Sequence, residues 1–288
     1  MQGLKLAVLA GLFVGLTSSV PAFADISIGI NAPRGEAQAK AEWSEFARYL
    51  EGKLGEPVVL TPVPVNKMVQ TITDKRVDFA LADPVMTVSV SQAHGMPLVA
   101  SLVPASGPQF GGVIIANPKA GITKIEDLKG KKVASLSNLA AGAYMFQAYE
   151  AMKHGLKVPQ DFAQWLEVKS QDDIVFAVKG GMMDAGFIRT GQLENMVKDG
   201  KVAESDVVVI DRKGGFPMAL STTLYPEWYM VNVTGDAAKA AKVKAALLAL
   251  DAESPAAKAA KIKGFSEPLD PAPIVEMLKA MKVPPFNQ

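Results

Sequence analysis

The chain has 288 residues, and 30 basic side chains nearly balance 29 acidic ones, for a formal net charge of +1. This balance gives no electrostatic reason to expect a nucleic-acid partner. The sequence contains no cysteine, which excludes disulfides, a thiol nucleophile, a lipid-anchoring cysteine and thiolate metal sites. A hydrophobic content of 49% is typical of a globular protein with a sizeable core.

Residues 1–24 have the features of a cleavable signal peptide. Lys5 supplies a positive start, Leu6–Leu16 is apolar, and Ala22-Phe23-Ala24 fits the small-x-small rule for signal peptidase. The apolar stretch is shorter than the roughly 20 residues that a bilayer requires, which disfavours an uncleaved anchor. We therefore expect cleavage before Asp25 and an exported, periplasmic product.

The first part of the mature chain alternates short apolar runs with helical patterns. The predicted strands are 26–30, 57–65 and 77–82, and the predicted helices are 37–54, 68–74 and a third from Pro84 onward. Asp83 is expected to cap this third helix, because proline follows it in the first turn. Such alternation indicates α/β layers around a largely parallel sheet.

The same pattern restarts after Pro118, with predicted strands at 133–134, 162–169 and 185–188. Helices are expected after Gly142, at 172–179 and from about Gln192. The runs VDFA at 77–80 and MDAGF at 183–187 each place an aspartate before a short apolar strand, a weak sign of two similar halves.

Two extended segments, 111–117 and 219–233, are predicted to cross between these halves. The expected organisation is a discontinuous first lobe, residues 25–112 and 217–288, interrupted by a second lobe at 113–216. Two lobes suit the length of the mature chain.

Six segments in order resemble the PhnD-like periplasmic binding proteins, which serve importers of phosphate, phosphite or phosphonate. The similarity is closest to the branch shared with the input domains of tetrathionate-type sensor kinases. The segments run from Ile28 to Trp228 and read IGINAPRGEAQAKAEWSEFARYLEGKLGEPV, VDFALADP, FGGVII, IEDLKGKKVA, DAGFIRTGQLE and STTLYPEW.

This resemblance implies a type II periplasmic binding protein fold, in which two α/β lobes joined by two crossover strands hold a ligand in the cleft. It implies binding and closure rather than chemistry. The expected partners are a small anionic ligand and a membrane ABC permease or, alternatively, a sensor kinase, with the binding protein acting as a monomer. No cofactor, metal or nucleic acid is expected.

The stretch from Lys131 to Met152, KKVASLSNLAAGAYMFQAYEAM, places small polar residues where a strand turns into a helix. A helix N-terminus exposes unpaired N–H groups and can bind an anion. Ser135, Ser137 and Asn138 would add donors, and Gly142 would permit close backbone contact. The alternative is that Ser137 or Asn138 only caps the helix.

Arg189 is a second candidate, in the loop Arg189-Thr190-Gly191 at the end of a predicted strand. The C-terminal end of a strand faces the usual ligand crevice of an α/β sheet, and the guanidinium fork suits an oxyanion. We therefore include Thr190 with Arg189. A surface pair with Glu194 is the alternative for this arginine.

Arg34 lies in the first strand-to-helix loop and is placed near the cleft by the same reasoning, with a salt bridge to Glu36 as an equal alternative. Thr87, in the first turn of the helix that follows Asp83, is a further candidate. An aspartate in the cleft would repel a bare anion. Asp83 therefore only caps its helix, or the ligand has a cationic or protonated part.

The run STTLYPEW contributes Ser221 and Tyr225 as candidates, although aromatic residues in a crossing strand equally suit core packing. Relatives commonly have arginine where Thr223 stands, which argues against a highly charged ligand. Enzyme functions are disfavoured, because His94 and His154 are the only histidines and each precedes a glycine at a predicted helix end. No metal-ligand spacing or nucleophile elbow is present.

Overall fold

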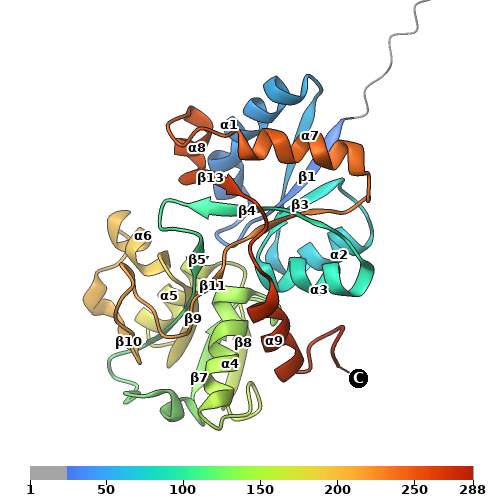
Figure 1. Ribbon diagram of the computed structural model, residues 1–288. Helices are drawn as coiled ribbons and strands as arrows, with labels where there is room; N and C mark the ends of the chain where they lie inside the picture. Colours follow the sequence, from blue (N-terminus) through green and yellow to red (C-terminus); the bar gives the residue numbers. More distant parts are fainter. Residues whose placement is uncertain (1–24, 288) are drawn as a thin grey trace, which may run out of the picture.

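The computed structural model describes residues 25–287, so the predicted signal peptide lies outside the described residues. Its helices and strands form two α/β lobes, one above the other in Figure 1. Within the described part of the chain, no helix combines the length and the apolar character needed to cross a bilayer.

The first lobe is built on a mixed six-stranded sheet. Its first three strands are parallel, with β1 between β2 and β3, as the alternating pattern predicts. Strand β12 then pairs antiparallel with both β3 and β4, and β13 pairs antiparallel with β4. In spatial order the strands are β13 (Ile262–Ser266), β4 (Leu98–Pro104), β12 (Tyr229–Asn232), β3 (Phe79–Ala82), β1 (Ile26–Asn31) and β2 (Val58–Val63).

Six helices accompany this sheet. Helix α1 turns Trp43, Phe46 and Leu50 into the core, as its apolar periodicity predicts. The final helix, α9, packs on α3. The helices are α1 (Glu36–Leu54), α2 (Met68–Thr73), α3 (Pro84–His94), α7 (Ala237–Leu248), α8 (Pro255–Ala260) and α9 (Ala272–Ala280).

The second lobe has a five-stranded sheet in which β7 is parallel to β8 and β9, and β6 is antiparallel to β9 and β10. In spatial order its strands are β10 (Val208–Ile210), β6 (Gly112–Ala116), β9 (Ala185–Arg189), β7 (Lys132–Ser135) and β8 (Gln164–Glu167). Its helices are the π-turn η3 (Ala141–Met145), which continues into α4 (Phe146–Lys153), then α5 (Gln171–Lys179) and α6 (Gln192–Lys198). Short 3₁₀ turns occupy Val65–Lys67, Ile125–Leu128 and Glu204–Asp206.

The aspartates of the two similar runs, VDFA at 77–80 and MDAGF at 183–187, have equivalent roles. Asp78, before β3, accepts a 2.8 Å hydrogen bond from the backbone N–H of Ser27 in β1. Asp184, before β9, accepts one of the same length from the N–H of Lys132 in β7. In both lobes a carboxylate thus ties the entry of one parallel strand to its neighbour.

The lobes are joined by two adjacent connections, which pair antiparallel as β5 (Gln109–Phe110) and β11 (Tyr225–Pro226). The first connection therefore lies just before the segment 111–117 that the sequence suggests, and most of that segment is β6 of the second sheet. Figure 1 shows β5 and β11 at the waist of the molecule. This pair places residues 226–228 directly at the boundary between the lobes.

Candidate functional site

A cavity of about 480 Å³ opens between the lobes. The loop at the end of β1, residues 31–35, forms its wall on the first lobe, together with residues 260–262 where α8 meets β13. The loop after β9, residues 189–192, forms the facing wall on the second lobe. Both loops follow the C-terminal ends of strands, which is where α/β sheets bind ligands.

A smaller space of about 20 Å³ lies next to this cavity and shares Asn31, Pro33, Gln171, Arg189 and Trp228 with it. Its remaining walls include Asp83 and the start of the π-turn, residues 140–143. That volume is enough for about one water molecule, since a water needs ~10–15 Å³ by the same kind of measure. The lobes are therefore closed tightly around this point.

Arg189 lies at the end of β9 and lines both spaces, as the sequence predicts for a residue of the cleft. Its guanidinium carbon lies 4.4 Å from the centre of the Phe110 ring and 5.9 Å from that of Trp228. Its Nη2 donates a hydrogen bond to Glu227. The alternative pairing with Glu194 is wrong.

Glu227 is completely buried at the boundary between β11 and β12. Burial raises the pKa of its carboxyl group, and the charge of Arg189 opposes that rise. The buried carboxylate therefore depends on Arg189 for compensation of its charge, whereas the Arg189 side chain is still 23% exposed.

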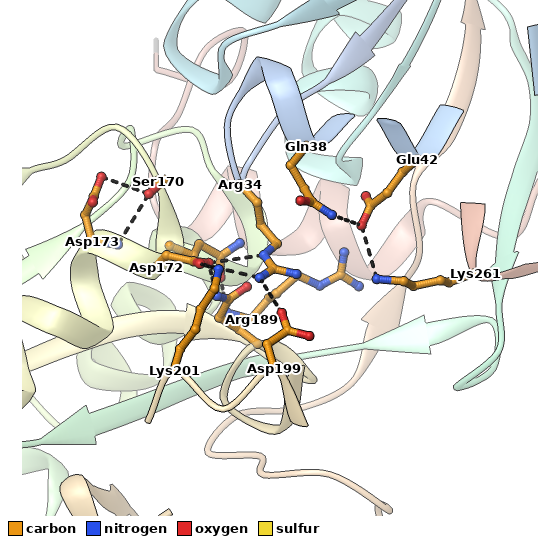
Figure 2. A network of polar contacts seen from close by, with 12 residues as sticks. Arg34, Gln38, Glu42, Ser170, Asp172, Asp173, Arg189, Asp199, Lys201 and Lys261 are labelled. Carbon is orange, nitrogen blue, oxygen red and sulfur yellow. Dashed lines mark hydrogen bonds and ion pairs between the residues drawn. The ribbon is translucent and has the colours of Figure 1, made fainter. Parts of the chain in front are cut away.

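Arg34 connects the two lobes rather than binding Glu36, so that alternative is also wrong. Its Nε lies 3.1 Å from Asp172, in the first turn of α5, and its Nη2 lies 3.2 Å from Asp199, after α6. Figure 2 shows the guanidinium reaching both carboxylates. Burial disfavours the charge of Arg34, but hydrogen bonds and charge from the two aspartates outweigh burial and raise its pKa.

The strand-to-helix stretch at 135–142 has no side-chain cap of its own. The N-cap position before the π-turn is occupied by Ala140, whose methyl side chain cannot accept a hydrogen bond. Ser137 Oγ accepts from the N–H of Leu139 at 3.4 Å, and Asn138 is exposed. The interpretation in which Ser137 or Asn138 caps this helix is therefore wrong.

A carboxylate from the other lobe takes that place. Asp83 Oδ2 accepts a hydrogen bond from the N–H of Ala141 at 3.1 Å, while its Oδ1 accepts one from Met86 at the same distance. The predicted cap of α3 is thus confirmed, and the same side chain also caps the second-lobe helix. Burial raises the pKa of Asp83 to about 7, against the opposing effect of these hydrogen bonds and of Arg189.

Gly142 is placed by close packing. A Cβ atom at this position would lie 2.7 Å from Cε2 of Phe110 and 2.8 Å from Cβ of Arg189. No real side chain tolerates such contacts, so only glycine lets the helix start approach Arg189 this closely. Gly142 lines the smaller space, and Thr190 lines the larger cavity and accepts a hydrogen bond from the N–H of Gly111 at 3.3 Å.

Four other candidate residues are engaged inside the lobes, and neither space has them in its lining. Thr87 donates to the carbonyl of Asp83, and Ser135 accepts from Nε1 of Trp165 at 2.7 Å. Ser221 donates to the carbonyl of Ile210 and accepts from the N–H of Ile114. Tyr225 stacks on Phe146, with ring centres 4.2 Å apart.

Sequence reasoning missed four polar residues of the site, namely Asn31, Gln171, Asp172 and Glu227. Asp172 opens the predicted helix 172–179 and Glu227 belongs to the run STTLYPEW, and neither pattern shows a partner. Asn31 is buried, lines both spaces, and its Oδ1 has no hydrogen-bond partner among residues 25–287. Its position directly after a strand was the one available signal.

One acidic group outside the cleft has metal-like geometry. Ligand atoms of Glu150, His154 and Asp211 lie within 4.8 Å of one another. Glu150 is already paired with Lys153 and Lys213, each at 2.6 Å. Its negative charge is therefore compensated by lysines, as expected for a structural ion-pair cluster.

A family model described as the periplasmic substrate-binding protein of phosphonate ABC transporters matches residues 28–271. Two solved structures share the fold. A binding protein component of an ABC phosphonate transporter from Pseudomonas aeruginosa has a TM-score of 0.74 and 18% identity, with 89% of this chain and 86% of that chain covered. PhnD1 from Prochlorococcus marinus, in complex with methylphosphonate, has a TM-score of 0.73 and 16% identity, with 89% and 98% covered.

A curated relative is the tetrathionate sensor histidine kinase TtrS of Salmonella typhimurium. It is 30% identical over 232 residues, which are 78% of this chain but only 39% of the kinase. The chain therefore spans about two fifths of the length of that relative. The two lobes, the paired connections and the interlobe cavity are those of a type II periplasmic binding protein. The chain belongs to the family of periplasmic substrate-binding proteins of phosphonate ABC transporters.

Proposed function

We propose that this protein captures a small oxyanion between its lobes and presents the closed form to an ABC permease, without changing the ligand chemically. The single observation that carries the proposal is the position of Arg189. It lies at the C-terminal end of β9, lines both interlobe spaces and is held by aromatic rings.

The guanidinium of Arg189 has capacity for an anion beyond its ion pair. A guanidinium carries five N–H donors in a rigid fork. Within residues 25–287, its one side-chain hydrogen bond goes to Glu227. The remaining donors lie beside the shared wall of the two spaces, where an oxyanion would accept from them.

Closure would follow from the way the lobes are joined. The only paired strands between the lobes among the described residues are the short β5 and β11. A ligand that touches both the 31–35 loop and the 189–192 loop would favour the closed form, because it gains contacts in that form alone.

The relative TtrS supports a second candidate for the partner. Because that sensor kinase carries a 30% identical region, the liganded protein could dock on a two-component sensor kinase instead of a permease. Neighbouring genes separate the two: a permease and ATPase pair supports import, and a histidine kinase with a response regulator supports sensing.

The proposal is tested by thermal shift of the mature chain against methylphosphonate, phosphite, phosphate, sulfate, tetrathionate and acetate. We expect at least one anion to raise the melting temperature, since a ligand stabilises by RT ln(1 + [L]/Kd). Arg189→Lys keeps a charge beside Glu227 but loses the fork, and should abolish most of that shift.

The matched control is Arg212→Lys, because Arg212 forms an exposed ion pair with Glu204 away from the cleft. It should leave the shift unchanged. Absence of a shift with every anion, or an equal shift in Arg189→Lys, would contradict the proposal. Mass spectrometry of the recovered anion should find it unaltered, since no chemistry is proposed.

A further inference from the structure

Two carboxylates of the protein occupy the groups that the second lobe would offer to an anion. Asp83 accepts the hydrogen bond of the Ala141 amide, and Glu227 accepts that of Arg189. Asp83 comes from the first lobe and Glu227 from the connection between the lobes. This part of the site is therefore filled by the protein's own negative oxygens.

The two contacts differ in their expected response to opening of the lobes. Glu227 has no exposed surface and directly follows β11 of the hinge, so we expect it to stay beside Arg189 when the lobes open. Asp83 reaches Ala141 only across the cleft, because the two residues lie on separate sheets and helices. Of these two contacts, opening the lobes would break only that of Asp83, together with the Arg34 pairs at the rim of the cleft.

There is also no room for an oxyanion while Asp83 stays in place. The space between Asp83, Arg189 and the helix start holds about 20 Å³. A tetrahedral oxyanion has at least three oxygens around its central atom and is larger than the single water that such a space admits. A ligand that reaches the Ala141 amide must therefore move the carboxylate away.

We propose that Asp83 is a specificity-determining residue whose carboxylate holds the empty lobes together on the Ala141 amide and competes with the ligand oxyanion for that amide. The competition rests on the proposed function, whereas the contact between the lobes does not. A ligand must replace the hydrogen bond between Asp83 and the Ala141 amide, and it must tolerate the displaced carboxylate nearby.

This requirement favours a singly charged or proton-bearing oxyanion over a bare dianion. The charged groups near Asp83 are Arg189, from β9, and its partner Glu227. The first turn of α3, residues 84–87, and the helix start, residues 140–143, contribute no titratable side chain. One guanidinium therefore serves two carboxylates before any ligand arrives, and the lining of the smaller space holds no further basic side chain for a dianion.

Asp83→Asn is the isosteric test. The amide oxygen can still cap α3, because asparagine is as good an N-cap as aspartate. Its other atom is a donor, which cannot accept from the Ala141 amide. The variant should bind sulfate and methylphosphonate at pH 8 about tenfold more tightly, the effect of losing a charge-assisted hydrogen bond of ~1.5 kcal/mol that competes with the ligand.

The matched control is Asp236→Asn, because Asp236 caps α7 through the N–H of Lys239 at 2.9 Å and is exposed. It should change neither anion affinity nor lobe separation. Asp83→Ser, which also retains a capping oxygen, should act in the same direction as Asp83→Asn.

Small-angle scattering of the ligand-free proteins supplies a readout that needs no ligand. Asp83→Asn and Asp83→Ser should have a larger radius of gyration than the unsubstituted protein and the Asp236→Asn control. If no anion binds any of the four proteins but the radius grows, the proposed function fails and the contact between the lobes stands. An unchanged radius, or equal or weaker anion affinity in both Asp83 variants, would overturn the inference.

Discussion

Arg34 and Asp172 form an ion pair of 3.1 Å between the two lobes, although 138 residues separate them in the chain. Asp172 also accepts hydrogen bonds from Lys201 at 2.6 Å and from Gln192 at 2.8 Å. These contacts hold the carboxylate in place, and Figure 2 shows Arg34 and Lys201 converging on it. The rim of the cleft thus contributes to closure independently of any ligand.

Arg34→Gln should loosen this rim. A partly exposed pair of this kind contributes about 1 kcal/mol to the closed form. Its loss would weaken the affinity for a cleft ligand roughly fivefold, since closure would then cost the ligand that much more. Isothermal calorimetry with whichever anion the thermal-shift screen identifies would measure the change.

The control for this prediction is Arg212→Gln, whose partner Glu204 belongs to the same lobe. It should leave affinity within error of the starting protein. Equal losses in both variants would indicate a general charge effect rather than a contact across the cleft.

Removing Arg189 alone from the Arg189–Glu227 pair should destabilise the fold more than removing both charges. Arg189→Met leaves a completely buried carboxylate without its partner and should cost about 3–5 kcal/mol in the free energy of unfolding. Adding Glu227→Gln removes that charge and should recover much of the loss. Urea unfolding of the two single variants and the double variant measures the coupling, and simple additivity would contradict a buried pair.

Local signals in the sequence were sufficient for much of the fold. The cap at Asp83 followed from proline in the next position, and the buried face of α1 followed from its period. The position of Arg189 at the cleft was predictable because the apolar run before it marks a strand. The C-terminal end of such a strand lies at the ligand crevice of an α/β sheet.

The partners of the charged residues were not predictable. Arg34 binds Asp172 and Asp199 rather than the nearby Glu36, and Arg189 binds Glu227 rather than the nearby Glu194. In both cases the sequence offers an acid within a few residues, whereas the fold brings in a distant one, through closure of the lobes for Arg34 and through the hinge for Arg189. The same closure lets Asp83 cap a second helix, which no pattern around Ser137 or Asn138 indicates.

Gly142→Ala should disturb the site through packing alone. The added methyl group would meet Phe110 and the Cβ of Arg189 at less than 3.0 Å, so the helix start or Arg189 must move. Overpacking of this kind costs about 1–3 kcal/mol in unfolding free energy. Gly214→Ala is the control, because nothing lies within 4 Å of a Cβ there. Comparable unfolding midpoints for the two variants would refute the close approach.

Asp83 should also make the protein less stable as the pH rises. Its pKa is about 7 in the fold, against about 3.9 in an unfolded chain, so the folded state binds the proton more tightly. The resulting stabilisation is fully present below pH ~4 and is lost as the pH rises through 7. Glu227, whose pKa burial also raises, acts in the same direction, whereas Asp78 and Asp172 have lowered pKa values and act in the opposite one. Comparison of Asp83→Asn with the unsubstituted protein cancels these other groups.

The measurement is urea unfolding of both proteins at pH 5 and at pH 8. At pH 5 Asp83 is protonated in the fold, so replacing it with a neutral asparagine removes no unfavourable charge. At pH 8 the buried charge is present only in the unsubstituted protein, and the variant should gain up to a few kcal/mol relative to it. A stability difference that is the same at both pH values would mean that Asp83 is ionised throughout, held by Arg189 and the two amides despite its burial.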